Sequence, residues 1–215
     1  MSMRLHEELL LLALREREGT THWVSWPTAV GAALLAELVA AGRVALPTDG
    51  KKQFVEAVDR RPLGDPLLDE CLAKVAAAPR RAQVAVWIAR FAGVKELKGR
   101  IAQGLCRQGV LRSDERSVLL LFKQRIYPEV DPRPEQEVRD RLRRLVFAET
   151  TRRDQRTLLL LSLADAGGLL PLLFEKRQLK ERREWVAELV AGEPLGRRVR
   201  EIVAAQHAAA VAAAT

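Results

Sequence analysis

The chain has 215 residues, of which 48% are hydrophobic and 30% charged, a composition that excludes a disordered chain and can fill one folded domain. Aromatic residues make up only 5%, while Leu, Ala, Val, Glu and Arg dominate, so a mainly α-helical fold is favoured over a β-sandwich or barrel. Cys71 and Cys106 are far apart, which excludes a disulfide or zinc framework and indicates a reducing compartment. We expect one cytoplasmic multi-helix domain over residues 1–215.

The net charge of +8 is distributed unevenly along the chain. Residues 80–130 contain eleven Lys and Arg against four Asp and Glu, a net charge of +7, whereas residues 1–79 carry −2 and residues 131–215 carry +3. This asymmetry indicates a surface directed at an anionic partner, either a membrane surface or a nucleic acid.

The first two predicted helices span residues 5–17 and 29–41. The apolar run in the first is only six residues long and follows two glutamates, so it does not resemble a secretory leader. The second is the predicted centre of the fold, because Glu37 is its only charged residue and a surface helix would carry more. At about 1.5 Å per residue it is too short to cross a bilayer, so we expect a buried core helix.

The ends of this central helix carry capping signals. Ser25 supplies a capping hydroxyl, Pro27 stands in the first turn, and Gly42 follows the last helical residue. The first turn begins beside Trp23 and Trp26, where free backbone N–H groups and the positive end of the helix dipole would lie near the surface. We therefore predict an anion site there.

The middle of the chain combines short strands with helices. Residues 43–46 and 53–58 are consistent with a small β-hairpin or an irregular excursion. Helices are predicted over residues 62–78, 82–91 and 94–108.

Two lysines flank the apolar stripe of the predicted helix over residues 94–108. At about 100° per residue, Lys98 lies about 40° and Lys95 about 100° from Val94, both on the same side of the stripe. The sequence thus predicts a cationic edge along this helix.

A β-hairpin is predicted at about residues 109–125. Residues 110–112 form its first strand, residues 113–117 a polar turn, and the sequence VLLLF its second strand, made of Val118, Leu119, Leu120, Leu121 and Phe122. A strand that is apolar on both faces must be covered by protein or by lipid. The basic and aromatic residues that follow suit the membrane interface. A hairpin folded back on its own domain is the alternative.

Helices over about residues 135–150, 154–166, 169–174, 178–191 and 195–213 complete the prediction. The charged run in the first of these is interpreted as a solvated helix face, and it contains Arg139, Arg141, Arg143 and Arg144.

Signatures of catalysis and metal binding are missing from the sequence. His6, His22 and His207 are isolated, and we find no Gly-rich phosphate loop, no G-x-S-x-G elbow and no paired carboxylates in an aromatic cleft. We therefore expect no metal, no cofactor and no enzymatic activity.

Five segments in order resemble the Golgi phosphoprotein 3 family, including its bacterial relatives. They are LHEELLLLAL, GAALLAELVAAGRVAL, PLGDPLLDECL, VWIARFAG, and LCRQGVL with VLLLF after it, and the resemblance as a whole covers Leu5 to about Leu172. The resemblance implies one mostly α-helical domain around a hydrophobic central helix, with a protruding apolar hairpin. Eukaryotic members are adaptors that bind phosphatidylinositol 4-phosphate on Golgi membranes and retain enzymes there.

The resemblance also implies a headgroup pocket. The family uses a tryptophan before the central helix, an arginine early in it, and two basic residues one turn apart before Gly-Val-Leu. Lys95 and Lys98 match the basic pair, whereas the arginine falls on Gly31 and the tryptophan on His22, one place before Trp23. Trp23 or Trp26 can replace the family's tryptophan after a small loop shift.

The expected function is that of a peripheral membrane protein that reversibly binds anionic phospholipid, phosphoinositides included. Lys95, Lys98, Trp23 and Trp26 would contact the headgroup while the hairpin enters the interface. The alternative is a protein-interaction or oligomerisation adaptor whose hairpin is covered by a partner or a second copy. A nucleic-acid binder is less expected, because no recognition helix, zinc finger or aromatic sheet motif is present.

Overall fold

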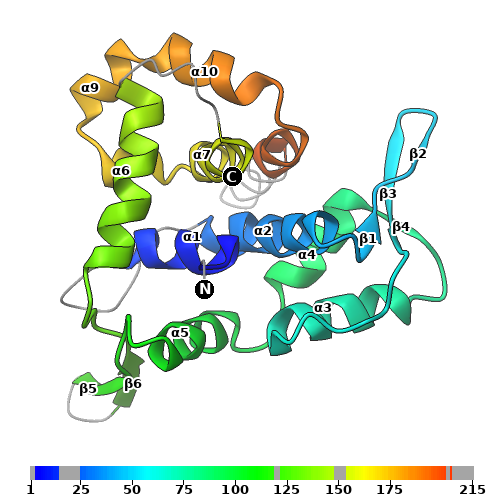
Figure 1. Ribbon diagram of the computed structural model, residues 1–215, viewed down its shortest axis with the longest axis horizontal. Coiled ribbons are helices and arrows are strands. Elements are labelled where there is room, and N and C mark those ends of the chain that lie inside the picture. Colours follow the sequence, from blue (N-terminus) through cyan, green and yellow to red (C-terminus); the bar gives the residue numbers. More distant parts are fainter. Residues whose placement is uncertain (1–2, 15–24, 119–121, 148–153, 202–203, 205–215) are drawn as a thin grey trace, which may run out of the picture.

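The computed structural model of the chain describes residues 3–14, 25–118, 122–147, 154–201 and 204. Helices α1 and α2 run across the middle of the view in Figure 1, with α3 and α5 below them and α6, α7, α9 and α10 above. The mainly α-helical fold with a buried central helix is confirmed. The helices are α1 (Leu5–Ala13), α2 (Trp26–Ala40), α3 (Pro66–Ala76), α4 (Val84–Ala92), α5 (Leu97–Arg107), α6 (Arg133–Phe147), α7 (Gln155–Ala166), α8 (Leu170–Leu173), α9 (Lys176–Glu181) and α10 (Arg183–Ala191), and residues 194–201 are also helical.

Helix α2 is the centre of the hydrophobic core. Eleven of its 15 residues are buried, and they lie on every side of the helix. Pro27 stands in its first turn, as predicted. At the other end Gly42 adopts φ 66°, and the N–H groups of Gly42 and Arg43 donate to the carbonyls of Val39 and Leu38. This Schellman arrangement needs a left-handed residue, which glycine provides without strain, and it ends the helix.

A small sheet caps one end of α2 and α4, on the right in Figure 1. Its strands are β1 (Val44–Ala45), β2 (Thr48–Asp49), β3 (Lys52–Ala57) and β4 (Ala82–Gln83), and the other three all pair antiparallel with β3. The predicted strands at residues 43–46 and 53–58 are therefore confirmed. The helix predicted over residues 82–91 begins two residues later because β4 takes its first two positions.

The second hairpin exists, but its predicted strands are wrong. Its strands are β5 (Asp114–Val118) and β6 (Phe122–Ile126), paired from Asp114 opposite Ile126 to Val118 opposite Phe122. The segment predicted as the turn is thus a strand, and the VLLLF run straddles the connection, with Leu119, Leu120 and Leu121 outside the described residues. The predicted first strand is instead used by the core, where Val110 and Leu111 are buried.

Helix α1 is buried along its whole length, including His6, Glu7 and Glu8. It ends at Ala13, four residues before the predicted end, and packs against α2, α5, α6 and α7. The segment predicted as one helix over residues 178–191 is divided into α9 and α10 at Arg182. In the part of the chain that the structure describes, no helix is both long enough and apolar enough to cross a membrane.

Candidate headgroup site

The beginning of α2 and the connection between α4 and α5 lie at one end of an antiparallel helix pair. α2 leads into β1, α4 follows β4, and both strands pair with β3, so the sheet marks the opposite end of the pair. The helices pack directly on each other, since Gly31 of α2 faces Ile88 and Ala92 of α4. This antiparallel packing brings Trp26 and Lys95, which are far apart in sequence, to the same end.

Lys95 and Lys98 lie at the start of α5 in different surroundings. α5 begins at Leu97, three residues later than predicted, so Lys95 lies in the preceding turn, where Glu96 adopts φ 54°. Lys95 is exposed. Lys98 is partly buried in the first helical turn, and this burial lowers its pKa. An anion placed against Lys98 would favour its charged form.

The amino-terminal end of α2 begins at Trp26, and Ser25 and Thr28 there are buried. Ser25 is the N-cap residue as predicted, yet its side chain accepts no hydrogen bond from the first turn. Trp26 is the first residue of α2 and is partly buried against the core, whereas Trp23 lies outside the described residues.

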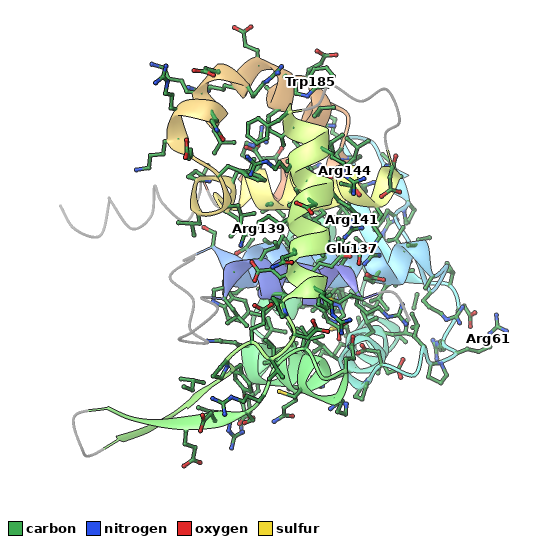
Figure 2. All side chains as sticks on the ribbon, turned by 60° about the vertical axis from the view of Figure 1, so that its left-hand side comes forward. Arg61, Glu137, Arg139, Arg141, Arg144 and Trp185 are labelled. Carbon is green, nitrogen blue, oxygen red and sulfur yellow. The ribbon has the colours of Figure 1, made fainter. Side chains whose placement is uncertain are left out.

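The β5–β6 hairpin projects from the side of the molecule that carries α5. It extends downward and away from the helices in Figure 1 and again in Figure 2, on the side opposite α9 and α10. Val118 and Phe122 form the last pair of its ladder. The structure therefore brings the hairpin and the lysine-bearing helix to a common side, and places Trp26 and Lys95 at the same end of the α2–α4 pair.

Comparison with known proteins gives the family. The family model described as Golgi phosphoprotein 3 (GPP34) matches residues 5–206. The chain belongs to the Golgi phosphoprotein 3 family. It is also 27% identical over 173 residues to vacuolar protein sorting-associated protein 74 of Schizosaccharomyces pombe, covering 70% of this chain and 49% of that protein. The chain thus spans about half the length of this curated relative.

Gly31 marks a departure from the Golgi phosphoprotein 3 family's implied pocket. A Cβ atom built on Gly31 would lie 2.5 Å from the Ile88 carbonyl oxygen and 2.9 Å from the Ala92 nitrogen, both backbone atoms. The position aligned with the family's arginine therefore has no room even for a methyl group. Position 31 therefore supplies no cation to a headgroup site.

A buried ionic network under α1 was missed by the sequence reasoning. Glu8 accepts a hydrogen bond from Arg141 of α6 at 2.7 Å, and Glu37 accepts bonds from the Leu5 N–H at 2.5 Å and from Arg156 of α7 at 3.2 Å. Burial raises the pKa of Glu8, and the two arginines oppose that shift. A lone acid in an apolar helix such as α2 was the available signal, because a buried charge requires a partner.

The interpretation of the α6 arginines as a solvated helix face holds for Arg143 and Arg144, which are exposed, but is wrong for Arg139 and Arg141. Figure 2 shows Arg139, Arg141 and Arg144 along α6. The Arg141 side chain is only 23% exposed because it reaches Glu8 on α1, and Arg139 pairs with the buried Glu135 and donates to a carbonyl of α8. Arg139 and Arg141 therefore connect α6 to α8 and α1.

The histidine and carboxylate chemistry in the described residues is structural. His6 is buried, its Nε2 lies 4.0 Å from Asp65, and burial lowers the pKa of His6 to about 4. Within the described ranges, no group of three or more His, Cys, Asp or Glu could hold a metal ion.

Proposed function

We propose that this chain binds reversibly to anionic phospholipid at a membrane surface, with no catalytic activity of its own. The observation that carries the proposal is the grouping of Lys95, Lys98 and the start of α2 at one end of the α2–α4 pair. Two cations and a set of backbone N–H groups without side-chain caps form a site for a headgroup phosphate. Membership of the family supports a phosphoinositide as the lipid, phosphatidylinositol 4-phosphate included.

Each basic side chain contributes only modestly to the free energy of membrane binding, so several are needed together. Each Lys or Arg near an anionic leaflet contributes about 1 kcal/mol. Residues 80–130 carry a net charge of +7, so several cations besides the two lysines are available for this attraction. Loss of the two lysines alone would remove about 2 kcal/mol, a factor of about 30 in membrane partitioning.

The test is flotation with phosphatidylcholine vesicles that contain graded amounts of phosphatidylserine or phosphatidylinositol 4-phosphate. Recovery should rise with anionic content and fall with salt, and the double substitution Lys95→Glu with Lys98→Glu should reduce it at least tenfold. The control makes the same charge change at Lys51 and Lys52, two exposed lysines at the sheet end of the molecule. Equal recovery on neutral and anionic vesicles, or an equal loss in the control, would refute the proposal.

The projecting hairpin favours a second candidate, a protein-interaction or oligomerisation adaptor. β5 and β6 form a two-stranded ladder that pairs with no other strand among the described residues. Open strand edges can pair with another chain. Light scattering over a range of protein concentrations tests this role, and a constant monomer mass would exclude self-association through the hairpin. Binding to nucleic acid stays an alternative to be tested by gel shift at physiological salt.

A further inference from the structure

A basic groove runs between the carboxyl end of α3 and the outer face of α4. Its cavity volume is about 760 Å³, within the usual range for small-molecule sites. The described residues that line it include three cations and no carboxylate, and the principal ones are Lys74, Arg80, Trp87, Arg90 and Gly93. We call this cavity the α3–α4 groove.

Two arginines in the α3–α4 groove lack the partners that arginines elsewhere on this surface have. Arg81 pairs with Asp49 at 2.6 Å and also stacks over Phe54. Its neighbour Arg80 has no carboxylate partner in the described part of the chain, and neither has Arg90, whose guanidinium lies 4.6 Å from the centre of the Trp87 ring. The charges of Arg80 and Arg90 are therefore available to a ligand.

The third cation of the groove shares its partner. Lys74 contacts Glu70 at 2.8 Å, and the other oxygen of Glu70 accepts a hydrogen bond from Arg100 at 2.5 Å. One carboxylate thus serves two cations, which leaves the wall of the groove with excess positive charge.

The floor of the groove contains a buried donor without an acceptor. Trp87 is 2% exposed, and its indole Nε1 has no hydrogen-bond partner among the described residues. Leaving such a donor unpaired is unfavourable, and most buried polar groups in proteins are paired. Because Trp87 lines the α3–α4 groove and is covered by Arg90, an acceptor that displaces Arg90 from the ring could reach this donor.

The groove is separate from the site at Lys95 and Lys98. Ile88 and Ala92 face α2, and Arg90 lies about 200° around the helix from each of them, so it points away from α2. The groove therefore lies on the side of α4 turned away from α2, and its lining includes neither Lys95 nor Lys98.

We propose that the α3–α4 groove binds a phosphate monoester. The three cations of the groove, Lys74, Arg80 and Arg90, are balanced better by close to two negative charges than by the single charge of a carboxylate. A phosphate monoester offers three terminal oxygens and close to two negative charges, and arginine forks match these oxygens in pairs. The remaining volume accommodates the organic part of the ligand against Ala77 and Ala78. This assignment does not depend on the membrane proposal.

The first test uses a soluble probe and the full chain. Glycerol 3-phosphate should bind saturably by calorimetry and change the tryptophan fluorescence, and the fluorescence change should be lost in Trp87→Phe. Arg80→Gln with Arg90→Gln should weaken binding at least tenfold. Lactate, a carboxylate of similar size, should bind at least tenfold more weakly than the phosphate.

Matched controls separate the groove from general charge and from the headgroup site. Arg61→Gln with Arg177→Gln removes the same charge from side chains that are 80% and 91% exposed, and should leave the affinity unchanged. Lys95→Glu with Lys98→Glu should also leave the affinity for glycerol 3-phosphate unchanged. The proposal is overturned if no saturable binding occurs, if the Arg80 and Arg90 variant binds like the wild type, if lactate binds as tightly, or if either control weakens binding equally.

Flotation with vesicles distinguishes a lipid phosphate from a soluble phosphate ester as the ligand of the α3–α4 groove. Phosphatidic acid carries a phosphate monoester and phosphatidylglycerol a diester. If the ligand is a lipid, the wild type should float preferentially with phosphatidic acid, and the Arg80 and Arg90 variant should lose that preference while it still floats on anionic vesicles. If soluble binding is groove-dependent but flotation does not change, the groove takes a soluble phosphate ester.

Discussion

The close approach of α2 and α4 at Gly31 predicts a large cost for adding one methyl group. In Gly31→Ala the new Cβ would lie 2.5 Å from the Ile88 oxygen, whereas ordinary contacts begin at 3.4 Å, so the helices must separate by nearly 1 Å. Overpacking of this kind costs about 1–3 kcal/mol, and the upper end applies because the clash is with backbone. Alanine also has a higher helix propensity than glycine, which stabilises the protein by about 1 kcal/mol, so the free energy of unfolding should fall by about 2 kcal/mol in total.

Urea denaturation followed by circular dichroism measures this loss, and the melting temperature should fall by about 4–8 °C. Gly192→Ala is the matched control, because no atom lies within 4 Å of its added Cβ and its φ of −83° suits alanine. The control should be neutral or slightly stabilising. A Gly31→Ala protein as stable as the wild type would refute the argument that this position has no room for the family's arginine.

Three further predictions concern buried groups. Glu37→Leu removes the acceptor of the buried Leu5 N–H and one of the two buried carboxylates that face Arg156, and should lower the free energy of unfolding by about 3 kcal/mol in urea titrations, whereas Glu181→Gln at an exposed pair should change it by less than about 0.5 kcal/mol. The pKa of His6 falls from 6.5 to about 4 on burial, so the folded state binds fewer protons between these values; stability should drop by about 3 kcal/mol as the pH falls through this window, and His6→Gln should lose that dependence. Burial raises the pKa of Cys71 to about 12, so a disulfide reagent should modify it only as the protein unfolds, and rapid labelling of the native protein would contradict its buried position.

The local features of the fold could be predicted because their causes are local. Helix α2 has almost no charge and ends before Gly42, so its burial and its carboxyl end follow from the order of its residues, although it begins at Trp26, three residues before the predicted start. The same holds for α3, where Asp65 caps the first turn by accepting from the N–H groups of Leu67 and Leu68, and Pro66 follows it.

The long-range features could not be predicted because their causes are distant in the sequence. Val110 and Leu111 have the sequence pattern of a strand, yet they are buried in the hydrophobic core. The β5–β6 ladder begins instead in the polar residues that follow them. Arg141 looks like part of a solvated run, but its partner Glu8 precedes it by 133 residues.

The candidate site was only partly predictable for the same reason. Lys95 and Lys98 could be named from spacing, but their position beside the start of α2 depends on the antiparallel packing at Gly31. The α3–α4 groove gave no sequence signal, since Arg80 lies in a bend before β4 whereas Trp87 and Arg90 lie on α4, and their shared cavity arises only when α3 packs nearby.

The buried ionic network also has a consequence for synthesis. Helix α1 precedes its partner Arg141 by more than 130 residues, and translation at about 5–20 residues per second makes that interval about 7–27 s. During this interval the leucine-rich segment of α1, which carries Glu7 and Glu8, has been synthesised but its partner Arg141 has not. Nascent α1 should therefore be a preferred binding site for chaperones, and slowing translation before residue 156 should increase aggregation more than slowing it afterwards.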